Sequence, residues 1–375
     1  MDFNLFAYFT LGRRHELEAG LAGLREDLYQ RMLDEVGTLV ELADARGYAG
    51  FGHPEHHLQI EGCEASNDLA ATAMFLGAHS RRLKIISCGW VSTTHNPVRA
   101  AETITTLDHM LKGRFAFGLV RGYQYRWVEN FKVQPGFAAV GPWNKDGAED
   151  LRNREHFAEY VDVVLKALTH DTFSHRGSFW QFPAIGMKNP HEHAVYRDFG
   201  RGVAEDMRIT EIGIAPRPYQ KPYPRLYGGF GASMRTALFW ARHNGCPIVM
   251  SGNLDFCATL WARYREEALR FGHDNPDGAQ AAWGGLMLCA PTDADAEAQF
   301  EDFRWFWERW SVPFGNPFPE LLVGSPDTIT RKIEAARNRF NPRECFLIVP
   351  QGLQPASQVG ASLDLFADKV MPRFQ

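Results

Sequence analysis

Short apolar segments alternate along the chain with longer segments in which apolar residues recur every three or four positions. The short segments are of strand length, and the longer ones have the period of a helix with one buried face. The short apolar segments predict eight strands, at residues 3–9, 48–52, 83–91, 115–120, 225–230, 247–251, 283–289 and 344–349. Segment 83–91 is apolar almost throughout, which is typical of a parallel strand with both faces covered.

The segments between these strands have helical spacing. Residues 27–46 are the clearest case, because apolar side chains recur at helical intervals and Gly47 is expected to end the helix. Strands that alternate with helices favour a parallel sheet covered by helices, in the α/β class. A (β/α)8 TIM barrel forming a single domain over residues 1–375 accounts for eight such units, and a doubly wound sheet is the alternative.

The regular alternation stops after the fourth predicted strand. Residues 122–150 are rich in aromatic residues, Gly and Pro, and residues 172–224 contain many turn residues with two β-like pieces at 178–182 and 208–214. A long irregular segment in a compact domain is usually functional. We therefore expect an insertion after strand four, with an excursion at about residues 172–224 over one mouth of the barrel.

Composition excludes several classes of function. The chain has 375 residues, 45% of them hydrophobic, and a net charge of -5, so nothing in it favours binding to nucleic acid or to an anionic membrane. The six cysteines are scattered without a CxxC pair and are expected to be small buried hydrophobes. The first residues lack the pattern of a signal peptide, and no apolar run reaches the roughly 20 residues of a membrane span, which predicts a cytoplasmic protein.

Candidate catalytic residues follow the second predicted strand, since barrels carry their working side chains where strands end. The sequence His-Pro-Glu-His-His at residues 53–57 could supply an acid, a base or metal ligands, and surface histidines without chemistry are the alternative. A metal is not expected, because neighbouring side chains point apart and a third ligand is not evident. The sequence His-Glu-His at residues 191–193 is interpreted as a chance pairing in an irregular loop.

Three further strand ends could bind a ligand. Small residues at 86–90 would let a flat ligand approach the backbone. Arg121 follows the fourth strand and could bind an anionic or carbonyl-rich group. Ser233 follows the fifth strand and is expected to cap a helix whose N–H groups favour a phosphate. The corresponding alternatives are a packed strand end, a salt-bridged rim arginine and an N-cap without a ligand.

Aromatic residues follow Arg121 in the stretch where regular spacing is lost. Tyr123, Tyr125 and Trp127 could contact an apolar or aromatic substrate, and loop packing is the alternative. We expect these aromatic residues and the excursion at about residues 172–224 to form the substrate pocket.

In this order and spacing, the motifs resemble the luciferase-like flavin monooxygenases, the family of bacterial luciferase. The resemblance runs over almost the whole chain. Its motifs are Ala-Asp-Ala-Arg-Gly-Tyr at 43–48, Glu-His-His at 55–57, Asn-Pro-Val-Arg-Ala-Ala-Glu at 96–102, Gly-Arg-Phe-Ala-Phe-Gly at 113–118, Arg-Gly at 121–122 and Gly-Ser-Pro-Asp at 324–327. Each motif is a modest signal alone, and together they are specific.

The resemblance implies FMN at the C-terminal mouth of the barrel, usually in a homodimer. His56 matches the family's active-site histidine, with Glu55 and His57 beside it as further catalytic candidates. The resemblance also places three pairs of residues at the flavin. Cys88 and Gly89 match the site of a non-proline cis peptide bond, and Arg121 with Gly122 lies beside the flavin. Gly231 and Ser233 belong to a phosphate-binding loop.

The implied reaction uses O2 and reduced FMN from a separate flavin reductase. A flavin peroxide would transfer one oxygen atom to a small organic substrate, by hydroxylation or by Baeyer–Villiger insertion at a carbonyl. His56 would donate a proton to the peroxide or take one from it. The lack of a dinucleotide fingerprint favours a partner reductase over direct NADH oxidation.

The chain also departs from luciferase. Val120 stands where luciferase has a cysteine, and the phosphate-loop glutamate of luciferase is not evident, so light emission does not follow. Residues 310–323 form a short stretch, which suggests a reduced lid. The rival interpretations are a deazaflavin-dependent dehydrogenase on the same barrel, a non-catalytic flavin carrier, and a metallohydrolase that uses His53, His56 and His191.

Overall fold

The structure is a computed structural model that describes residues 1–141, 143–188, 193–231 and 233–375. The chain forms two compact units, and each is described by itself. The first unit consists of Met1–Gly89, Arg114–Gly118 and Arg225–Gln375, and the second of Trp90–Gly113 and Leu119–Pro224. The first unit contains the barrel, and the second contains the irregular excursion. That the whole chain is one domain remains a prediction.

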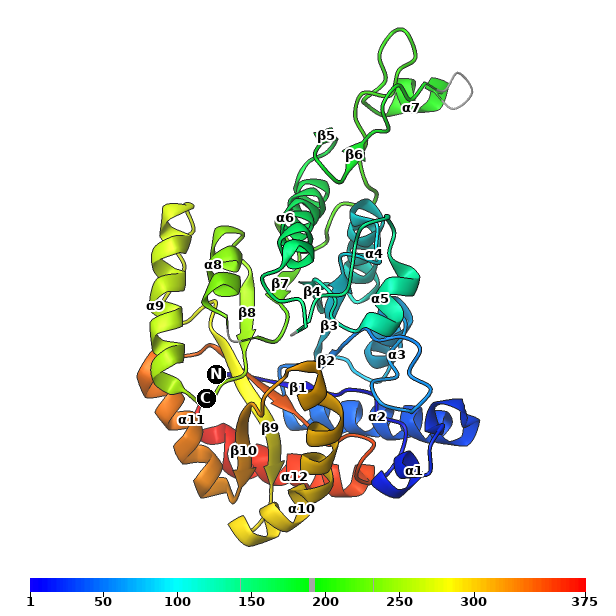
Figure 1. Cartoon of the computed structure of the whole chain (residues 1–375). Coiled ribbons are helices and arrows are strands. Elements are labelled where there is room, and N and C mark those ends of the chain that lie inside the picture. The colour runs from blue at the N-terminus through cyan, green and yellow to red at the C-terminus, as the bar shows by residue number, and fades with distance from the viewer. Residues whose placement is uncertain (142, 189–192, 232) are drawn as a thin grey trace. The chain divides into compact units, whose positions relative to one another are not determined.

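Eight parallel strands close into a barrel (Figure 1). They are β1 Asp2–Phe6, β2 Gly50–His53, β3 Lys84–Val91, β4 Phe115–Val120, β7 Arg225–Gly228, β8 Cys246–Val249, β9 Ala282–Cys289 and β11 Glu344–Ile348. The sheet runs from β1 through β2, β3, β4, β7, β8 and β9 to β11, and β11 pairs with β1 in register from Asp2–Glu344 to Phe6–Ile348. All eight predicted strands are confirmed, and the closed ring excludes the doubly wound sheet.

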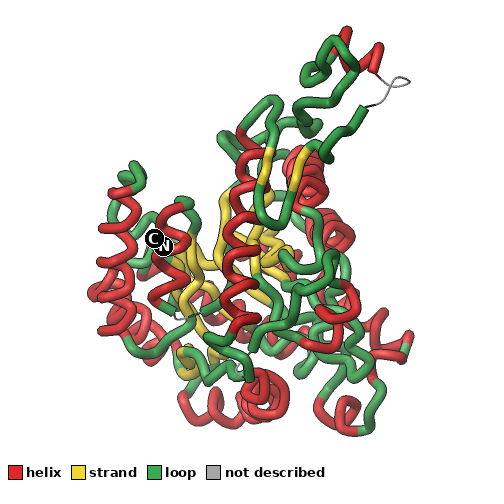
Figure 2. The backbone as a smooth tube through the Cα atoms, turned by 45° about the horizontal axis from the view of Figure 1, so that its top comes forward, coloured by secondary structure: helices red, strands yellow, loops and turns green. Residues whose placement is uncertain are grey.

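Helices lie outside the strands of the first unit, as the red and yellow tubes of Figure 2 show. α2 shows how the sequence builds them, because the apolar residues predicted for its inner face are buried and Gly47 ends it at a φ of +80°. The helices of this unit are α1 Arg14–Glu18, η1 Ala22–Leu24, α2 Glu26–Arg46, α3 Leu69–Ala78, α8 Met234–Arg242, α9 Leu254–Arg270, α10 Asp293–Phe306, α11 Pro326–Phe340, α12 Ala356–Lys369 and η4 Met371–Arg373.

One strand of the first unit lies outside the predicted set. Helix α10 continues through a π-helical turn, η2 Trp307–Ser311, and a 3₁₀ turn, η3 Val312–Phe314, towards β10, Glu320–Gly324. β10 pairs in parallel with the second half of β9, whose first residues pair with β8. The stretch in which we expected a shortened lid is therefore partly regular structure that extends the sheet.

The second unit is mainly helical and carries a short hairpin. The predicted β-like piece at 178–182 overlaps β6, but the piece at 208–214 forms only isolated bridges, such as Ile212 with Phe173, so its assignment as a β-piece is wrong. The elements of this unit are α4 Pro97–Met110, α5 Tyr125–Phe131, α6 Ala148–Thr169, β5 His175–Arg176, β6 Gln181–Phe182 and α7 His193–Phe199.

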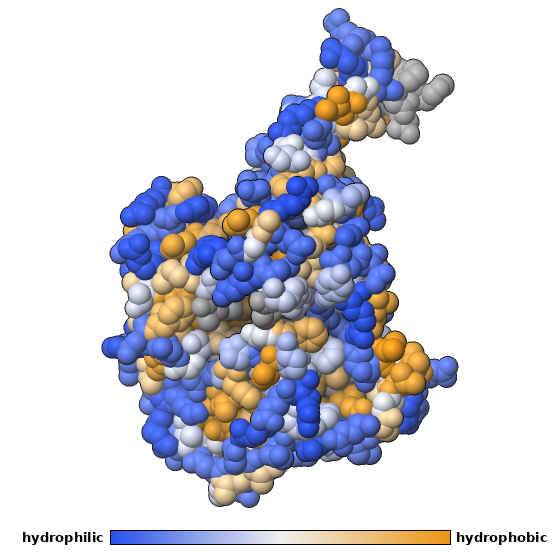
Figure 3. All heavy atoms as spheres, viewed as in Figure 1, coloured by the Kyte–Doolittle hydropathy of each residue, from blue (hydrophilic) through white to orange (hydrophobic). Residues whose placement is uncertain are grey.

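The cysteines and the large apolar side chains lie where the composition of the chain leads us to expect them. All six cysteines are free and buried, which confirms that they pack as small apolar residues. Large side chains such as Phe6, Tyr227 and Phe346 fill the barrel. Figure 3 shows that hydrophilic residues cover most of the face that it presents, with apolar residues in smaller areas between them. Among the described residues, no helix combines the length and the apolar character needed to cross a bilayer.

Candidate functional site

The predicted catalytic loop begins where β2 ends and folds back on itself. The backbone N–H of His56 donates to the carbonyl of Ser66 at 2.8 Å, which ties the two sides of the loop together. Glu55 and His56 are buried, with 4% and 6% of their surface exposed, and His57 is half-buried. The loop histidines therefore belong to a packed structure, and the alternative of surface histidines without partners does not hold.

His53, the last residue of β2, is fully buried and hydrogen-bonded on both ring nitrogens. Its Nε2 is 2.8 Å from Ser87 Oγ on β3, and its Nδ1 is 3.2 Å from the Pro54 carbonyl and 3.3 Å from Ser66 Oγ. Burial lowers the pKa of His53 to about 4. The ring is therefore neutral near pH 7, and its bonds join the end of β2 to β3 and to the catalytic loop.

Each of the two following histidines lies against a buried glutamate of the same loop. His57 Nε2 is hydrogen-bonded to Glu55 Oε1 at 3.0 Å. His56 Nδ1 lies 3.0 Å from Glu64 Oε2, and only 2% of Glu64 is exposed. A carboxylate against one ring nitrogen orients an imidazole, so both histidines are placed for acid–base chemistry.

The end of β3 brings backbone very close to β4. The Cys88–Gly89 peptide bond is cis, as the resemblance implied. A Cβ atom on Gly89 would lie 2.3 Å from the carbonyl oxygen of Gly118, and a Cβ on Gly118 would lie 2.5 Å from Cys88 Sγ. Neither glycine can carry a side chain, because atoms of the neighbouring strand fill the space, as in the packed strand end that was the alternative. Burial raises the pKa of the Cys88 thiol to about 12, so it is protonated and packs as an apolar group.

The loop after β7 leads into the N-terminus of α8. Phe230 packs edge-on against Phe6 at 4.6 Å between ring centroids, above the barrel core. The N–H of Gly231 donates to the Ile248 carbonyl at 3.1 Å. Ser233 occupies the N-cap position of α8, but its side chain makes no capping hydrogen bond, which corrects the expected cap. The first N–H groups of α8 are thus not satisfied by that hydroxyl.

In the second unit, Arg121 is bound to a buried carboxylate. Arg121 Nη1 lies 2.5 Å from Asp150 Oδ1, and Arg154 Nη2 lies 2.8 Å from Asp150 Oδ2. Burial alone would raise the pKa of Asp150, but the N–H of Asp146 and the two guanidinium groups lower it to about 2. Gly122 has a φ of +88°, and a Cβ there would lie 2.6 Å from Val91 Cγ1. The loop after β4 is therefore held by a cluster of ion pairs. This agrees with the alternative interpretation of Arg121 as a salt-bridged arginine at the rim of the barrel.

The three aromatic residues proposed for the substrate differ in exposure. Trp127 is 2% exposed, its Nε1 donates to Gln124 Oε1 at 2.9 Å, and it packs with Val128 inside the second unit. Tyr125 is 62% exposed and Tyr123 is half-buried. Trp127 acts as loop packing in this structure, whereas the two tyrosines have surface to offer a ligand. Contact with a substrate remains a prediction for all three.

Sequence reasoning missed the partners of the predicted residues. Glu64, Ser66 and Asp150 stand in segments without a recognised motif, and only the folded loops bring them to His56, His53 and Arg121. In the part of the chain that the structure describes, no three His, Cys, Asp or Glu side chains gather as metal ligands. His191 and Glu192 of the other histidine motif lie outside the described residues, and so does the side chain of His193.

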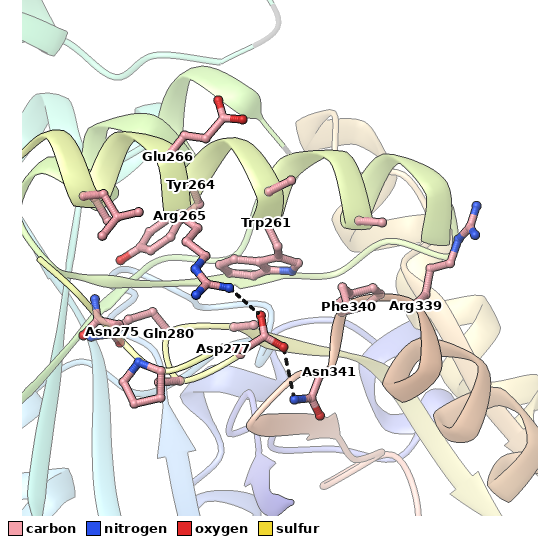
Figure 4. A pocket seen from close by; sticks show the side chains of 18 of the residues that line it. Trp261, Tyr264, Arg265, Glu266, Asn275, Asp277, Gln280, Arg339, Phe340 and Asn341 are labelled. Atoms are coloured by element: carbon pink, nitrogen blue, oxygen red, sulfur yellow. Dashed lines mark hydrogen bonds and ion pairs between the residues drawn. The ribbon is translucent and has the colours of Figure 1, made fainter.

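A cavity of about 470 Å3 lies at the opposite end of the barrel, where β9 begins (Figure 4). It is lined by α9, by the segment before β9 and by the end of α11. Arg265 and Asn341 both reach Asp277, at 3.4 Å each, so these polar side chains contact one another. The lining of the cavity thus includes charged and amide side chains, among them Arg265, Asp277 and Asn341.

Residues at the C-terminal ends of β2 and β7 suit a flavin. The N-terminus of α8 can accept a phosphate. Buried His56 with its carboxylate adds a group able to hold or release a proton.

The chain belongs to the luciferase-like monooxygenase family, whose pattern it matches over residues 1–342. It is therefore a flavin-dependent oxidoreductase. The 3,6-diketocamphane 1,6-monooxygenase of Pseudomonas putida is 24% identical over 325 residues, which cover 78% of this chain and 80% of that protein. The alkanal monooxygenase alpha chain of Photorhabdus luminescens is 41% identical over 267 residues, 70% of this chain and 59% of that one.

A solved structure shows the same fold. It is the oxygenating constituent of 3,6-diketocamphane monooxygenase from Pseudomonas putida, a type II Baeyer–Villiger monooxygenase in complex with FMN. The match covers 100% of this chain and 99% of that chain with a TM-score of 0.73 and 18% sequence identity. At this identity the likeness establishes the barrel, and the chemistry of this chain has to be argued from its own residues.

Proposed function

We propose that the protein is an FMN-dependent monooxygenase that takes reduced FMN from a separate reductase and uses O2 to oxygenate a small apolar or aromatic organic substrate. The observation that carries the proposal is the buried pair of His56 and Glu64 at the end of β2, in a chain of this family. We further propose that it acts in the cytoplasm as a homodimer.

FMN would be held by the residues that match the family's flavin motifs. Cys88 and Gly89 are proposed to lie under the flavin ring, and Gly231 and Ser233 precede the helix that would hold the phosphate. Arg121 and Gly122 are proposed to lie beside the flavin. When bound in its reduced form, FMN would supply the activation of O2 and the transfer of one oxygen atom.

The chain's own residues control protons at this site. His56 would hold or release a proton, with Glu64 Oε2 at 3.0 Å from its Nδ1. His57, hydrogen-bonded to Glu55, is a second titratable group on the same loop. His53 is neutral and tied to Ser87, so it positions the loop and takes no part in proton transfer near pH 7.

The substrate is the least constrained part of the proposal. Tyr123 and Tyr125 have exposed surface, which supports an apolar or aromatic partner, while Trp127 would act by packing beneath them. One structural neighbour is a Baeyer–Villiger monooxygenase and another is a long-chain alkane monooxygenase, so both oxygen insertion at a ketone and hydroxylation are to be tested. A cyclic ketone is one of the first substrates to test.

The test supplies the protein with photoreduced FMN, 18O2 and a panel of cyclic ketones, aldehydes and aromatic compounds. We expect one 18O atom in the product and retained FMN binding but about 10²–10⁴-fold less product in His56→Ala. His79→Ala is the matched control, because His79 lies 2.8 Å from Glu41 on the surface and away from the site. Equal product from His56→Ala would remove His56 from the mechanism.

A parallel assay separates the rival on the same barrel. A deazaflavin-dependent dehydrogenase would oxidise its substrate with oxidised deazaflavin under argon and would put no 18O into the product. Turnover under those conditions, with none from reduced FMN and O2, would overturn the monooxygenase proposal. FMN binding without oxygen uptake or product across the panel would leave the non-catalytic carrier.

A further inference from the structure

We propose that His53 is a positioning residue that does more than hold its own loop. Its neutral ring, with the N–H on Nδ1 and with Nε2 as an acceptor, fixes the end of β3 and the loop that carries His56 in one arrangement. That this arrangement serves oxygenation rests on the proposed function. The tautomer and the link between the two segments are properties of this chain alone and can be measured without a flavin.

The first support is the position of His53 in the sheet. His53 and Ser87 are the last pair in the register of β2 with β3, and β2 ends at this pair. Beyond it the chain turns into the loop that carries His56, while Ser87 leads directly into Cys88 and Gly89. The ring of His53 therefore stands where the segment proposed to serve the proton and the segment proposed to serve the flavin part from each other.

The second support is the direction of the hydrogen bonds on the ring. Nδ1 of His53 lies 3.2 Å from the carbonyl oxygen of Pro54, and a carbonyl oxygen can only accept, so Nδ1 carries the proton. In a neutral ring Nε2 then has a lone pair, and the Ser87 hydroxyl at 2.8 Å donates to it. Ser66 Oγ lies 3.3 Å from Nδ1 as a second, longer contact. The donor and the acceptor of the ring are thus directed at different segments.

The third support is the path from the ring to His56. Ser66, whose hydroxyl contacts His53, accepts the backbone N–H of His56 on its carbonyl oxygen at 2.8 Å. His53 and Ser87 have no exposed surface, and Ser66 is 2% exposed. A buried polar group is costly to leave unpaired, so the ring and the two serines form one unit. A displacement of Ser87 is therefore expected to be felt at Ser66 and at the backbone of His56.

The surroundings of His53 keep the ring uncharged. Phe9, which follows β1, packs edge-on against it with 6.1 Å between ring centroids. Two carboxylates favour the protonated form, Glu55 in the same loop and Asp68 at the N-cap of α3. Burial outweighs both of them and lowers the pKa of His53 to about 4. Near pH 7 the ring therefore keeps the lone pair on Nε2 that the Ser87 hydroxyl requires.

The first measurement reads the tautomer and needs no cofactor. Long-range ¹H–¹⁵N correlation spectra of the full-length protein labelled at histidine distinguish Nδ1–H from Nε2–H, and His53→Gln identifies the signal. We expect Nδ1–H in the wild type, unchanged from neutral to mildly acidic pH. In Ser87→Ala the ¹⁵N resonance of Nε2 should move, because that nitrogen loses its donor. A dominant Nε2–H signal in the wild type would overturn the inference.

The second measurement tests the link between the two segments. Ser66→Ala, Ser87→Ala and the double variant form a double-mutant cycle, measured in the unfolding equilibrium constant and in product formation. Because effects within one hydrogen-bond network are not additive, the combined loss should differ from the product of the single losses by about 5-fold. The difference should vanish when the cycle is repeated in His53→Leu.

A buried serine elsewhere in the first unit provides the control for this cycle. Ser362 Oγ accepts from the backbone N–H of Cys289 at 2.7 Å, in a contact between α12 and β9. Ser362→Ala should lower stability, but its effect should simply multiply with that of Ser87→Ala. Single losses that also multiply for Ser66→Ala and Ser87→Ala would overturn the inference.

Two replacements of His53 separate positioning from folding. The amide oxygen in His53→Gln can reach the place of Nε2 and accept from Ser87, whereas the shorter side chain in His53→Asn can replace only Nδ1. Per folded molecule, His53→Gln should keep product within about 10-fold of the wild type and His53→Asn should lose about 100-fold, since a small misplacement of working groups is enough for such a loss. Equal product from His53→Asn and the wild type would overturn the inference. Absence of product from the wild type, with the expected tautomer and the coupling in unfolding, would instead refute the proposed function and leave the link made by His53 in place.

Discussion

The two ends of the barrel both hold buried charged groups, but those groups are connected in different ways. At the end where the strands begin, Glu344 of β11 accepts from Asn4 Nδ2 of β1 at 2.8 Å and from the Tyr227 hydroxyl of β7 at 2.7 Å. Its other oxygen lies 2.6 Å from Arg225 Nε of β7. One carboxylate therefore joins three strands across the interior of the barrel.

At the end where the strands finish, the buried carboxylates serve a single loop. Glu64 and Glu55 lie against His56 and His57, and all four residues belong to the segment between β2 and α3. His53, through Ser87, joins this segment to the neighbouring strand β3. The network around Glu344 therefore connects strands of the barrel. The contacts of Glu55 and Glu64 instead hold the histidines of one loop in place.

The sharpest way to test this difference is to remove the carboxylate that joins the strands. Glu344→Ala leaves the half-buried Arg225 guanidinium without its carboxylate; breaking a fully buried pair costs about 3–5 kcal/mol of folding free energy, and we expect a loss near the lower end of this range. We expect that loss in guanidinium unfolding curves, with product formation per folded molecule unchanged.

A less buried ion pair of the same unit provides the control. Glu320 lies 3.3 Å from Lys332, and its removal in Glu320→Ala should cost only about 0–1 kcal/mol, since the pair is partly solvated. Equal losses from Glu320→Ala and Glu344→Ala would show that the buried network is not what holds the barrel together.

A glycine at the mouth tests whether the close approach of β3 to β4 is required. In Gly89→Ala the new methyl group would lie 2.3 Å from a backbone oxygen that cannot move aside easily, so we expect a loss at the upper end of about 1–3 kcal/mol and weaker FMN binding. Gly360→Ala in α12 is the control, because its methyl group would meet Leu42 Cδ2, the end of a flexible side chain, at 3.2 Å. Thermal unfolding and FMN titration of both variants give the comparison, and similar results from the two would contradict it.

The sequence predicts the barrel well because its signal is local. Helical spacing and short apolar runs are properties of neighbouring residues, and they located all eight strands. β10 was not predicted because its five residues stand between segments rich in Pro and Gly. These residues form a strand because they pair with β9. Residues 208–214 have strand-like composition but find no continuous partner, so only isolated bridges form.

The candidate site is predicted only in part, for the same reason. His56 is placed correctly at the end of a barrel strand by its motif, but Glu64 reaches it only through a left-handed turn that composition does not reveal. Arg121 likewise meets Asp150 only after the intervening loop has folded. The residues that contact a motif in the folded protein depend on the conformation of loops. Loop conformation, unlike a helix or a strand, produces no periodic pattern in the sequence.

The smallest effect expected at the mouth is a pH dependence of stability due to His53. Its pKa is about 4 when folded against 6.5 in the unfolded chain, so the unfolded state takes up more protons between these values and stability falls as the pH falls through this range. Between pH 7 and pH 5 the loss of unfolding free energy due to His53 amounts to about 2 kcal/mol.

The variant His53→Gln tests this effect, because glutamine does not titrate. Its unfolding free energy should fall less than that of the wild type over this interval. Some dependence should remain, because burial also lowers the pKa of His156 in the second unit to about 4. Identical pH profiles for the variant and the wild type would mean that His53 becomes charged in the folded protein, and that the mouth of the barrel is more solvated than its hydrogen bonds imply.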